Sequence, residues 1–154
     1  MSPKSLVFSL LAGLACASTC VFAQTTATDP WVRGTVAQQK ATGLFVQLTS
    51  AKGGKLVSAS SPAAGAVEIH EMSMDGDMMK MRALTQGLAL PAGKAVALKP
   101  GGLHLMLLDL KQPLKTGDTV EVTLVIEGAD KARETLLLKA PVRALNSSAP
   151  EHKH

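Results

Sequence analysis

Turn-forming residues interrupt the apolar sequence at short intervals, and this pattern constrains the fold more than any other feature. After residue 23, no apolar pattern with helical spacing extends far. Short β-rich runs alternate instead with Gly, Pro and Asp signals, such as Asp75-Gly76. Their spacing predicts an all-β sandwich or barrel of about nine strands. The predicted strands are Trp31–Arg33, Thr42–Thr49, Lys55–Ser60, Val67–Met72, Met78–Leu84, Lys94–Leu98, Leu103–Leu110, Thr119–Ile126 and Glu134–Ala140.

The first 23 residues have the order of a secretory signal peptide. Lys4 precedes the apolar run Leu6–Ala17, and small residues lead to a cleavage position after Ala23. The apolar run is shorter than the roughly 20 residues that span a bilayer. We therefore expect a signal peptide over residues 1–23, one domain over residues 24–144 and a flexible, His-containing tail over residues 145–154.

Both cysteines, Cys16 and Cys20, lie inside the predicted signal peptide. The mature chain would then contain no cysteine, which excludes a disulfide framework. Leu14-Ala15-Cys16 resembles a lipoprotein cleavage motif, but Gly13 fits that motif poorly. The sequence thus favours soluble export over a lipid anchor.

Composition argues against two broad classes of function. The net charge of +4 accompanies only 3% aromatic residues, too few to stack on nucleic-acid bases. No Ser/His/Asp motif, nucleotide-binding loop or HExxH pattern appears, so we expect neither an enzyme nor a small-molecule substrate. An electron-transfer cupredoxin requires a Cys thiolate, which the mature chain lacks.

Methionine is concentrated in one predicted hairpin. The chain has seven methionines, and those within Val67–Arg82 are Met72, Met74, Met78, Met79 and Met81. If Asp75-Gly76 forms a two-residue turn, Met72 faces Met79 and His70 faces Met81. These four side chains would then share one face of the ribbon.

A second His–Met pair lies at His104 and Met106, which point the same way in a strand. Imidazole and thioether together suit Cu(I), whereas hard cations prefer oxygen. Methionine also serves as flexible core filler. A metal-free exported β-sandwich that acts as a protein-interaction module therefore remains an alternative.

These residues resemble the PCuAC family of periplasmic copper chaperones. Ten residues separate His70 from Met81, twenty-two separate Met81 from His104, and His104-Leu105-Met106 completes the pattern. The second gap is one residue longer than the family pattern. Lys99–Met106 and Pro113–Asp118 also read like the family.

The resemblance implies a cupredoxin-like Greek-key β-sandwich or barrel of eight to nine strands. It also implies one Cu(I) held by His70, Met81, His104 and Met106. The expected recipient is the CuA centre of cytochrome c oxidase subunit II, a Sco-type protein, or both. We expect a monomer.

Further donors could assist transfer. Met72 and Met79, with Met74 and Met78, are candidate transient ligands for Cu(I). His152 and His154 in the tail are candidate ligands for Cu(II), as in the extensions that family members often carry.

Overall fold

The computed structural model describes residues 24–144 and 146, which form ten β-strands and no helix. The described residues thus contain no helix long and apolar enough to cross a membrane. The strands are β1 (Thr25–Arg33), β2 (Ala41–Ser50), β3 (Gly54–Ser60), β4 (Ala64–Asp75), β5 (Met78–Ala83), β6 (Leu88–Leu90), β7 (Ala95–Leu98), β8 (Leu103–Leu110), β9 (Thr119–Gly128) and β10 (Arg133–Arg143).

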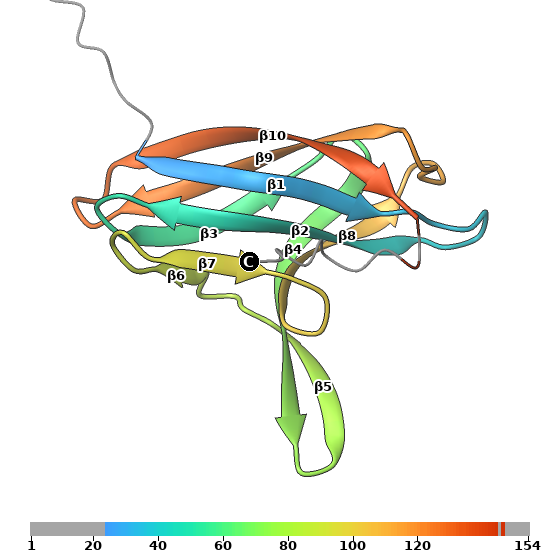
Figure 1. Cartoon of the computed structure of the whole chain (residues 1–154), viewed down its shortest axis with the longest axis horizontal. Helices are drawn as coiled ribbons and strands as arrows, with labels where there is room; N and C mark the ends of the chain where they lie inside the picture. Colours follow the sequence, from blue (N-terminus) through green and yellow to red (C-terminus); the bar gives the residue numbers. More distant parts are fainter. Residues whose placement is uncertain (1–23, 145, 147–154) are drawn as a thin grey trace, which may run out of the picture.

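Seven of these strands close into a barrel (Figure 1). Their order is β4-β8-β2-β1-β10-β9-β3, and the pair Ala59–Val67 between β3 and β4 completes the ring. The short strands β6 and β7 extend the wall beside β3 and β2. Closure leaves few free sheet edges, which are otherwise prone to aggregation.

Strict alternation of apolar side chains builds the core. Val120, Val122, Leu124 and Ile126 all point inward from β9 and are almost fully buried. Leu105 does the same from β8. Each such side chain contributes roughly 1.5–3 kcal/mol relative to an exposed one. The barrel is therefore stabilised mainly by its interior.

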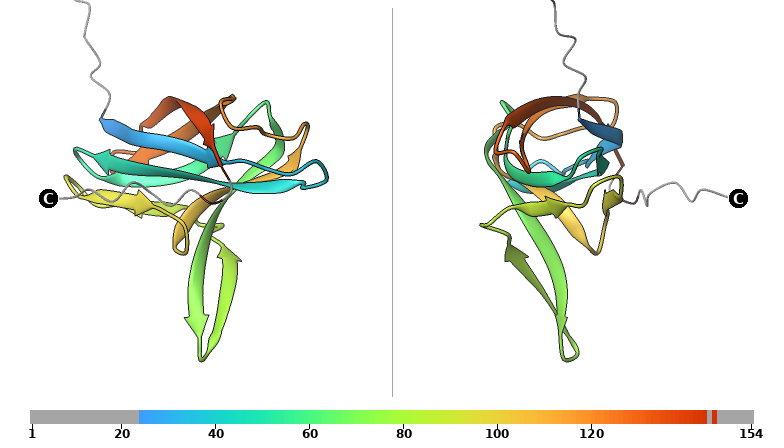
Figure 2. Two further views of the ribbon diagram at one scale, coloured as in Figure 1. Left: turned by 45° about the vertical axis from the view of Figure 1, so that its right-hand side comes forward. Right: turned by 90° about the vertical axis from the view of Figure 1, so that its left-hand side faces the viewer.

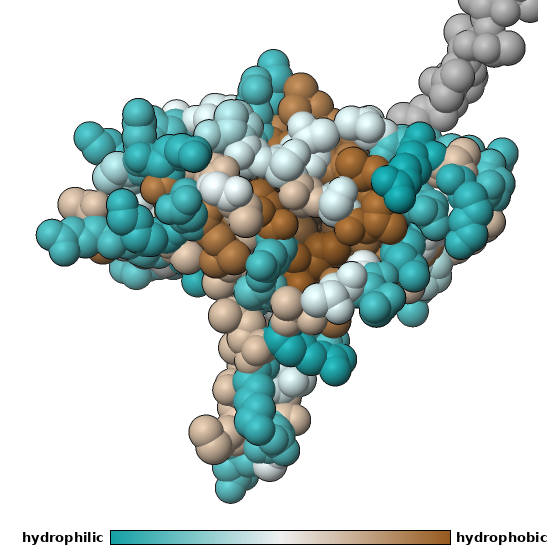
Figure 3. Space-filling model, turned by 180° about the vertical axis from the view of Figure 1, so that it is seen from behind, coloured by the Kyte–Doolittle hydropathy of each residue, from teal (hydrophilic) through white to brown (hydrophobic). Residues whose placement is uncertain are grey.

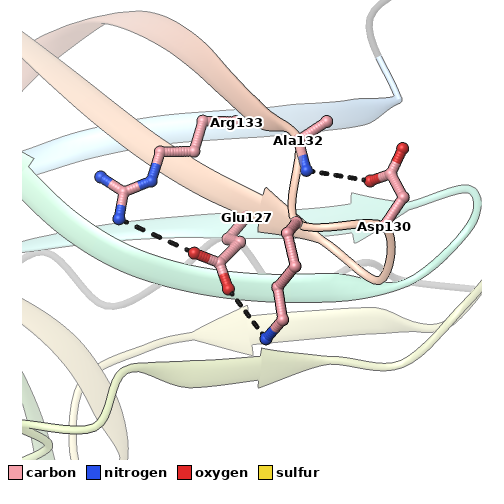
Figure 4. A network of polar contacts seen from close by, with 5 residues as sticks. Glu127, Asp130, Ala132 and Arg133 are labelled. Carbon is pink, nitrogen blue, oxygen red and sulfur yellow. Dashed lines mark hydrogen bonds and ion pairs between the residues drawn. The ribbon is translucent and has the colours of Figure 1, made fainter.

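Exposed polar contacts surround the turn of the β9–β10 hairpin (Figure 4). Lys131 has a positive φ of 67°, and the Asp130 carboxylate accepts the Ala132 N–H at 3.1 Å, which fixes the tight turn. Glu127 forms exposed ion pairs with Lys131 at 3.4 Å and with Arg133 at 3.7 Å. Such pairs contribute little to stability.

The β4–β5 hairpin leaves the barrel and projects away from it (Figures 1 and 2). The first part of β4 pairs with β8 as far as Glu71. Beyond that residue, the strand pairs only with β5, which lies at the end of the sheet. One strand thus belongs to the barrel wall and to the projection.

The all-β architecture predicted from turn spacing is confirmed, and each of the nine predicted runs corresponds to a strand, with Leu84 and Lys94 falling just outside β5 and β7. The structure adds β6, whose three residues are too few for a pattern to identify. It also begins β1 at Thr25, earlier than predicted. The polar residues before Trp31, interrupted by a register shift and a positive φ at Asp29, concealed that part of the strand.

Candidate metal centre

The hairpin turn differs from the predicted one. Its two central residues are Gly76 and Asp77, because Asp75 pairs with Met78 across the strands. Gly76 has a φ of 63°, and Asp77 does not share this left-handed conformation. Glycine at the first central position with positive φ there alone is the pattern of a type II′ turn, not the predicted type I′.

This turn moves the register by two residues. Met72 faces Met81 and His70 faces Ala83, so the predicted pairs Met72–Met79 and His70–Met81 are wrong. A shift of two residues preserves the alternation of side chains. His70, Met72, Met79 and Met81 therefore still share one face, and Met81 is the diagonal neighbour of His70 rather than its direct partner.

The two candidate histidines face each other across β4 and β8. His70 and His104 are directly paired, and their ring centroids lie 5.7 Å apart in an edge-on arrangement. Both are buried, with 9% and 7% of their surface exposed. Pairing of β4 with β8 thus brings together residues that are distant in the sequence.

His104 has one ring nitrogen fixed by the backbone. The Gly102 carbonyl can only accept, so Nδ1 of His104 carries the proton and donates to it at 3.0 Å. In the neutral ring, Nε2 therefore keeps its lone pair. Burial lowers the pKa of His104 below its usual 6.5, the Gly102 hydrogen bond raises it, and the neighbouring His70 and Arg33 lower it further. The ring stays neutral near pH 7.

His70 forms its hydrogen bond through the other ring nitrogen, Nε2. Its Nε2 lies 2.7 Å from the Glu68 carboxylate, which accepts the ring proton. Nδ1 is buried and has no hydrogen-bond partner among the described residues. Leaving such an atom unsatisfied costs about 1–3 kcal/mol. Metal-ligating histidines commonly donate their other N–H to a carboxylate in this way.

The predicted thioethers lie on either side of the histidine pair. Met106 is half-buried, two residues along β8 from His104 on the same face, and pairs with Glu68. Met81 lies one row nearer the hairpin end, opposite Met72, and is 49% exposed. Diagonal neighbours about 7–8 Å apart are within reach of a long, flexible side chain.

These donors fit Cu(I) better than a hard cation. No group of three or more His, Cys, Asp or Glu residues in the described chain could hold a metal ion. A site here must therefore use sulfur beside the two imidazoles, and thioethers select soft ions such as Cu(I). Of the auxiliary candidates, Met72, Met74 and Met79 lie on the same face, whereas Met78 pairs with Asp75 on the opposite face of the hairpin, away from the histidines. His152 and His154 fall outside the described residues.

Sequence reasoning missed the residues that support the histidines. Glu68 is two residues from His70 and so on its face of the strand, which was the available signal. Phe45 lies against His104 with ring centroids 6.4 Å apart, and the Arg33 guanidinium lies 5.3 Å from the Phe45 ring. Gly43 permits this, because a Cβ there would meet the Phe45 ring at 2.8 Å.

Comparison of the sequence with known proteins gives one family. The family described as "Putative lipoprotein LpqE-like" matches residues 25–142. A "Putative lipoprotein" of Leifsonia xyli subsp. xyli is 34% identical over 94 residues, and an uncharacterized protein of Rickettsia prowazekii is 31% identical over 104 residues. These matches cover 61% and 64% of the chain but only 57% and 58% of the two relatives.

Solved structures with the same fold are PCuAC domains and related proteins. The copper-bound PCuAC domain from PmoF2 aligns with a TM-score of 0.63 at 22% identity, covering 79% of this chain and 94% of that domain. The Cu(I) form of DR1885 from Deinococcus radiodurans aligns with a TM-score of 0.59 at 29% identity, covering 87% and 85%. The resemblance to PCuAC domains and the cupredoxin-like fold are thereby confirmed.

Proposed function

This chain belongs to the LpqE-like family, and from that premise we propose that it is an exported copper chaperone that carries one Cu(I) ion. The ligands would be His70, Met81, His104 and Met106. The observation that carries the proposal is the buried histidine pair. Each ring has one nitrogen engaged by Gly102 or Glu68, which leaves the other to bind a metal.

The chemistry of these donors suits a carrier. Two imidazoles and two thioethers are neutral, so Cu(I) gains soft ligands without a thiolate that an oxidising compartment could convert to a disulfide. His104 needs no deprotonation near neutral pH, because burial has already lowered its pKa. Binding there would release few protons.

Exposure divides the donors into a holding set and a releasing set. The two histidines are buried in the barrel wall, whereas Met81 is half-exposed on the projecting hairpin. A ligand from a partner protein could therefore replace Met81 first and bind the ion before the histidines dissociate from it. Ligand exchange of this kind supports transfer without a free ion. The Cu(I) form of DR1885, at 29% identity, supports Cu(I) as the cargo.

We further propose that the recipient is the CuA centre of cytochrome c oxidase subunit II, directly or through a Sco-type protein. The support is the His-x10-Met and His-x-Met spacing that the chain has in common with PCuAC chaperones. Reconstitution of the CuA centre in apo subunit II from the copper-loaded protein tests this step. Absence of transfer to both subunit II and a Sco-type protein would exclude this destination.

Export is proposed to proceed by cleavage after Ala23, giving a periplasmic protein that starts at Gln24. The matched family and one relative are described as lipoproteins. The competing outcome is therefore a lipid anchor attached through Cys16 or Cys20. The mass of the mature protein distinguishes them. A chain beginning at Gln24 without lipid supports soluble export, and an acylated cysteine contradicts it.

Titration of the mature chain with Cu(I) against a competing chelator tests the proposed centre. We expect one tightly bound ion, weakened in Met106→Leu and in Met81→Leu. Met78→Leu is the matched control, because Met78 pairs with Asp75 on the opposite face of the same hairpin. If the wild-type protein binds no Cu(I), the chain is the metal-free interaction module instead.

A further inference from the structure

The projecting hairpin carries a row of thioethers beyond the proposed centre. On the face that bears His70, Met72 pairs with Met81 and Met74 pairs with Met79. Directly opposed side chains in an antiparallel pair have Cβ atoms about 4.5–5.5 Å apart. Four sulfurs therefore lie in two adjacent cross-strand pairs, leading from the histidines toward the end of the hairpin.

Packing does not account for these methionines. Met74, Met79 and Met81 are 63%, 52% and 49% exposed, and the hairpin that bears them stands clear of the barrel (Figure 3). None of them belongs to the hydrophobic core. Filling an interior gap is the usual structural use of methionine, and here it is ruled out by position.

Apart from Met78, the opposite face of the hairpin is polar. The Arg82 guanidinium donates to the Glu71 carboxylate at 2.7 Å, and Lys80 pairs with Asp75. The four cross-paired thioethers thus lie on one face, whereas the other face carries the ion pairs and a single methionine, Met78. A surface for binding an apolar partner would not require sulfur, whereas a soft cation would.

We infer that Met72, Met74, Met79 and Met81 form a second Cu(I) site, made of thioethers alone, which exchanges the ion with the His70–His104 centre. The inference rests on the proposed function and extends it. Met81 belongs to both ligand sets, so the ion can pass from one to the other by exchanging one ligand at a time. Copper stays Cu(I) throughout, and no proton or electron moves.

The row is suited to capture rather than storage. Methionine side chains are flexible and polarizable, and an exposed set must be ordered before it binds an ion. The thioether site should therefore bind more weakly than the buried histidine centre. When Met81 is engaged at the inner centre, three thioethers remain for a second ion.

The test is a Cu(I) titration of the full mature chain, followed by NMR of ¹³C-labelled methionine methyl groups under reducing conditions. The first equivalent should shift Met81 and Met106, and the second should shift Met74 and Met79. Met78 is the internal control and should not move. If Met74 and Met79 stay fixed up to excess Cu(I), or Met78 shifts equally, the inference is wrong.

Two variants separate this inference from the proposed function. Met74→Leu/Met79→Leu should keep the first equivalent and lose the second, and retention of both would overturn the thioether site. His70→Ala/His104→Ala should lose the tight ion and still bind Cu(I) on the methionines. If the wild type binds one ion and this variant binds none, the proposed centre stands and the thioether site fails.

Discussion

The barrel and the projecting hairpin use the same alternating strand pattern for opposite purposes. In the barrel, each strand turns its apolar side chains into a closed interior, where Leu105 and Leu107 are fully buried. In the hairpin, neither face is covered, and the apolar positions are held by methionine. Burial makes the first region stable, whereas exposure leaves the second free to change its contacts.

β4 joins the two regions, and His70 lies where they meet. It is the last buried residue of β4, in the stretch where the strand still pairs with β8. The histidines are therefore buried by the barrel, whereas Met81 is half-exposed on the hairpin. The proposed carrier function would use both properties, because the protein would have to hold an ion and then release it.

Truncation of single side chains should show the largest contrast. Leu105→Ala opens a cavity in the barrel interior and should lower the free energy of unfolding by about 2–5 kcal/mol. Met78→Ala, at an exposed hairpin position, should change it by less than about 0.5 kcal/mol. Urea denaturation of both apo proteins measures this. Similar losses in the two variants would mean that the hairpin is packed against something in solution.

The next contrast concerns the proposed ligands in the two regions. His104→Ala removes a buried donor and should weaken Cu(I) binding by more than about 100-fold, since loss of a residue that only supports a ligand already costs 10–100-fold. Met81→Leu should cost less, because Met72 lies opposite and can substitute. Chelator competition gives both affinities. A greater loss for Met81→Leu would place the holding ligands on the hairpin instead.

A smaller effect should follow from loosening His70 without removing it. Glu68→Ala deletes the carboxylate that holds Nε2, so the ring can turn and Cu(I) affinity should fall by about tenfold. Glu71→Ala is the matched control, because Glu71 points to the other face and pairs with Arg82. Equal effects of the two changes would indicate a general loss of negative charge rather than positioning of His70.

The sequence predicted the faces of the strands better than their neighbours. Period-two alternation placed His104 and Met106 on one face and Leu105 on the other, as the structure shows. It also grouped His70 with Met81 on one face. The turn was not determined, because Asp75-Gly76-Asp77 allows glycine at either central position. Both choices preserve the alternation, and only the paired strands distinguish them.

Local sequence patterns did not predict the contacts between strands that are distant in the sequence. The pairing of β4 with β8, which sets His70 opposite His104, depends on closure of the whole sheet. The same closure brings Phe45 from β2 against His104. Glu68 was predictable as a neighbour on the face of His70, but its hydrogen bond depends on the rotamers of both side chains.

The smallest expected effect is the pH dependence of the stability of the apo protein. It reports the cost of placing a charge on His104 in the barrel wall. Burial lowers the pKa of His104 in the folded state, so between that value and about 6.5 the unfolded chain binds more protons than the folded one. Stability should therefore fall as the pH drops below about 6.5 and level off once the folded-state pKa is passed.

His104→Gln removes this titration while keeping a polar side chain. The wild type should lose stability relative to the variant as the pH is lowered from 7.5 to 5, in a series of urea unfolding curves. Protons and Cu(I) compete for Nε2 of the same ring, so Cu(I) affinity should decline over the same range. If the wild-type stability falls with pH in parallel with that of the variant, the barrel wall does not hold His104 in its neutral form.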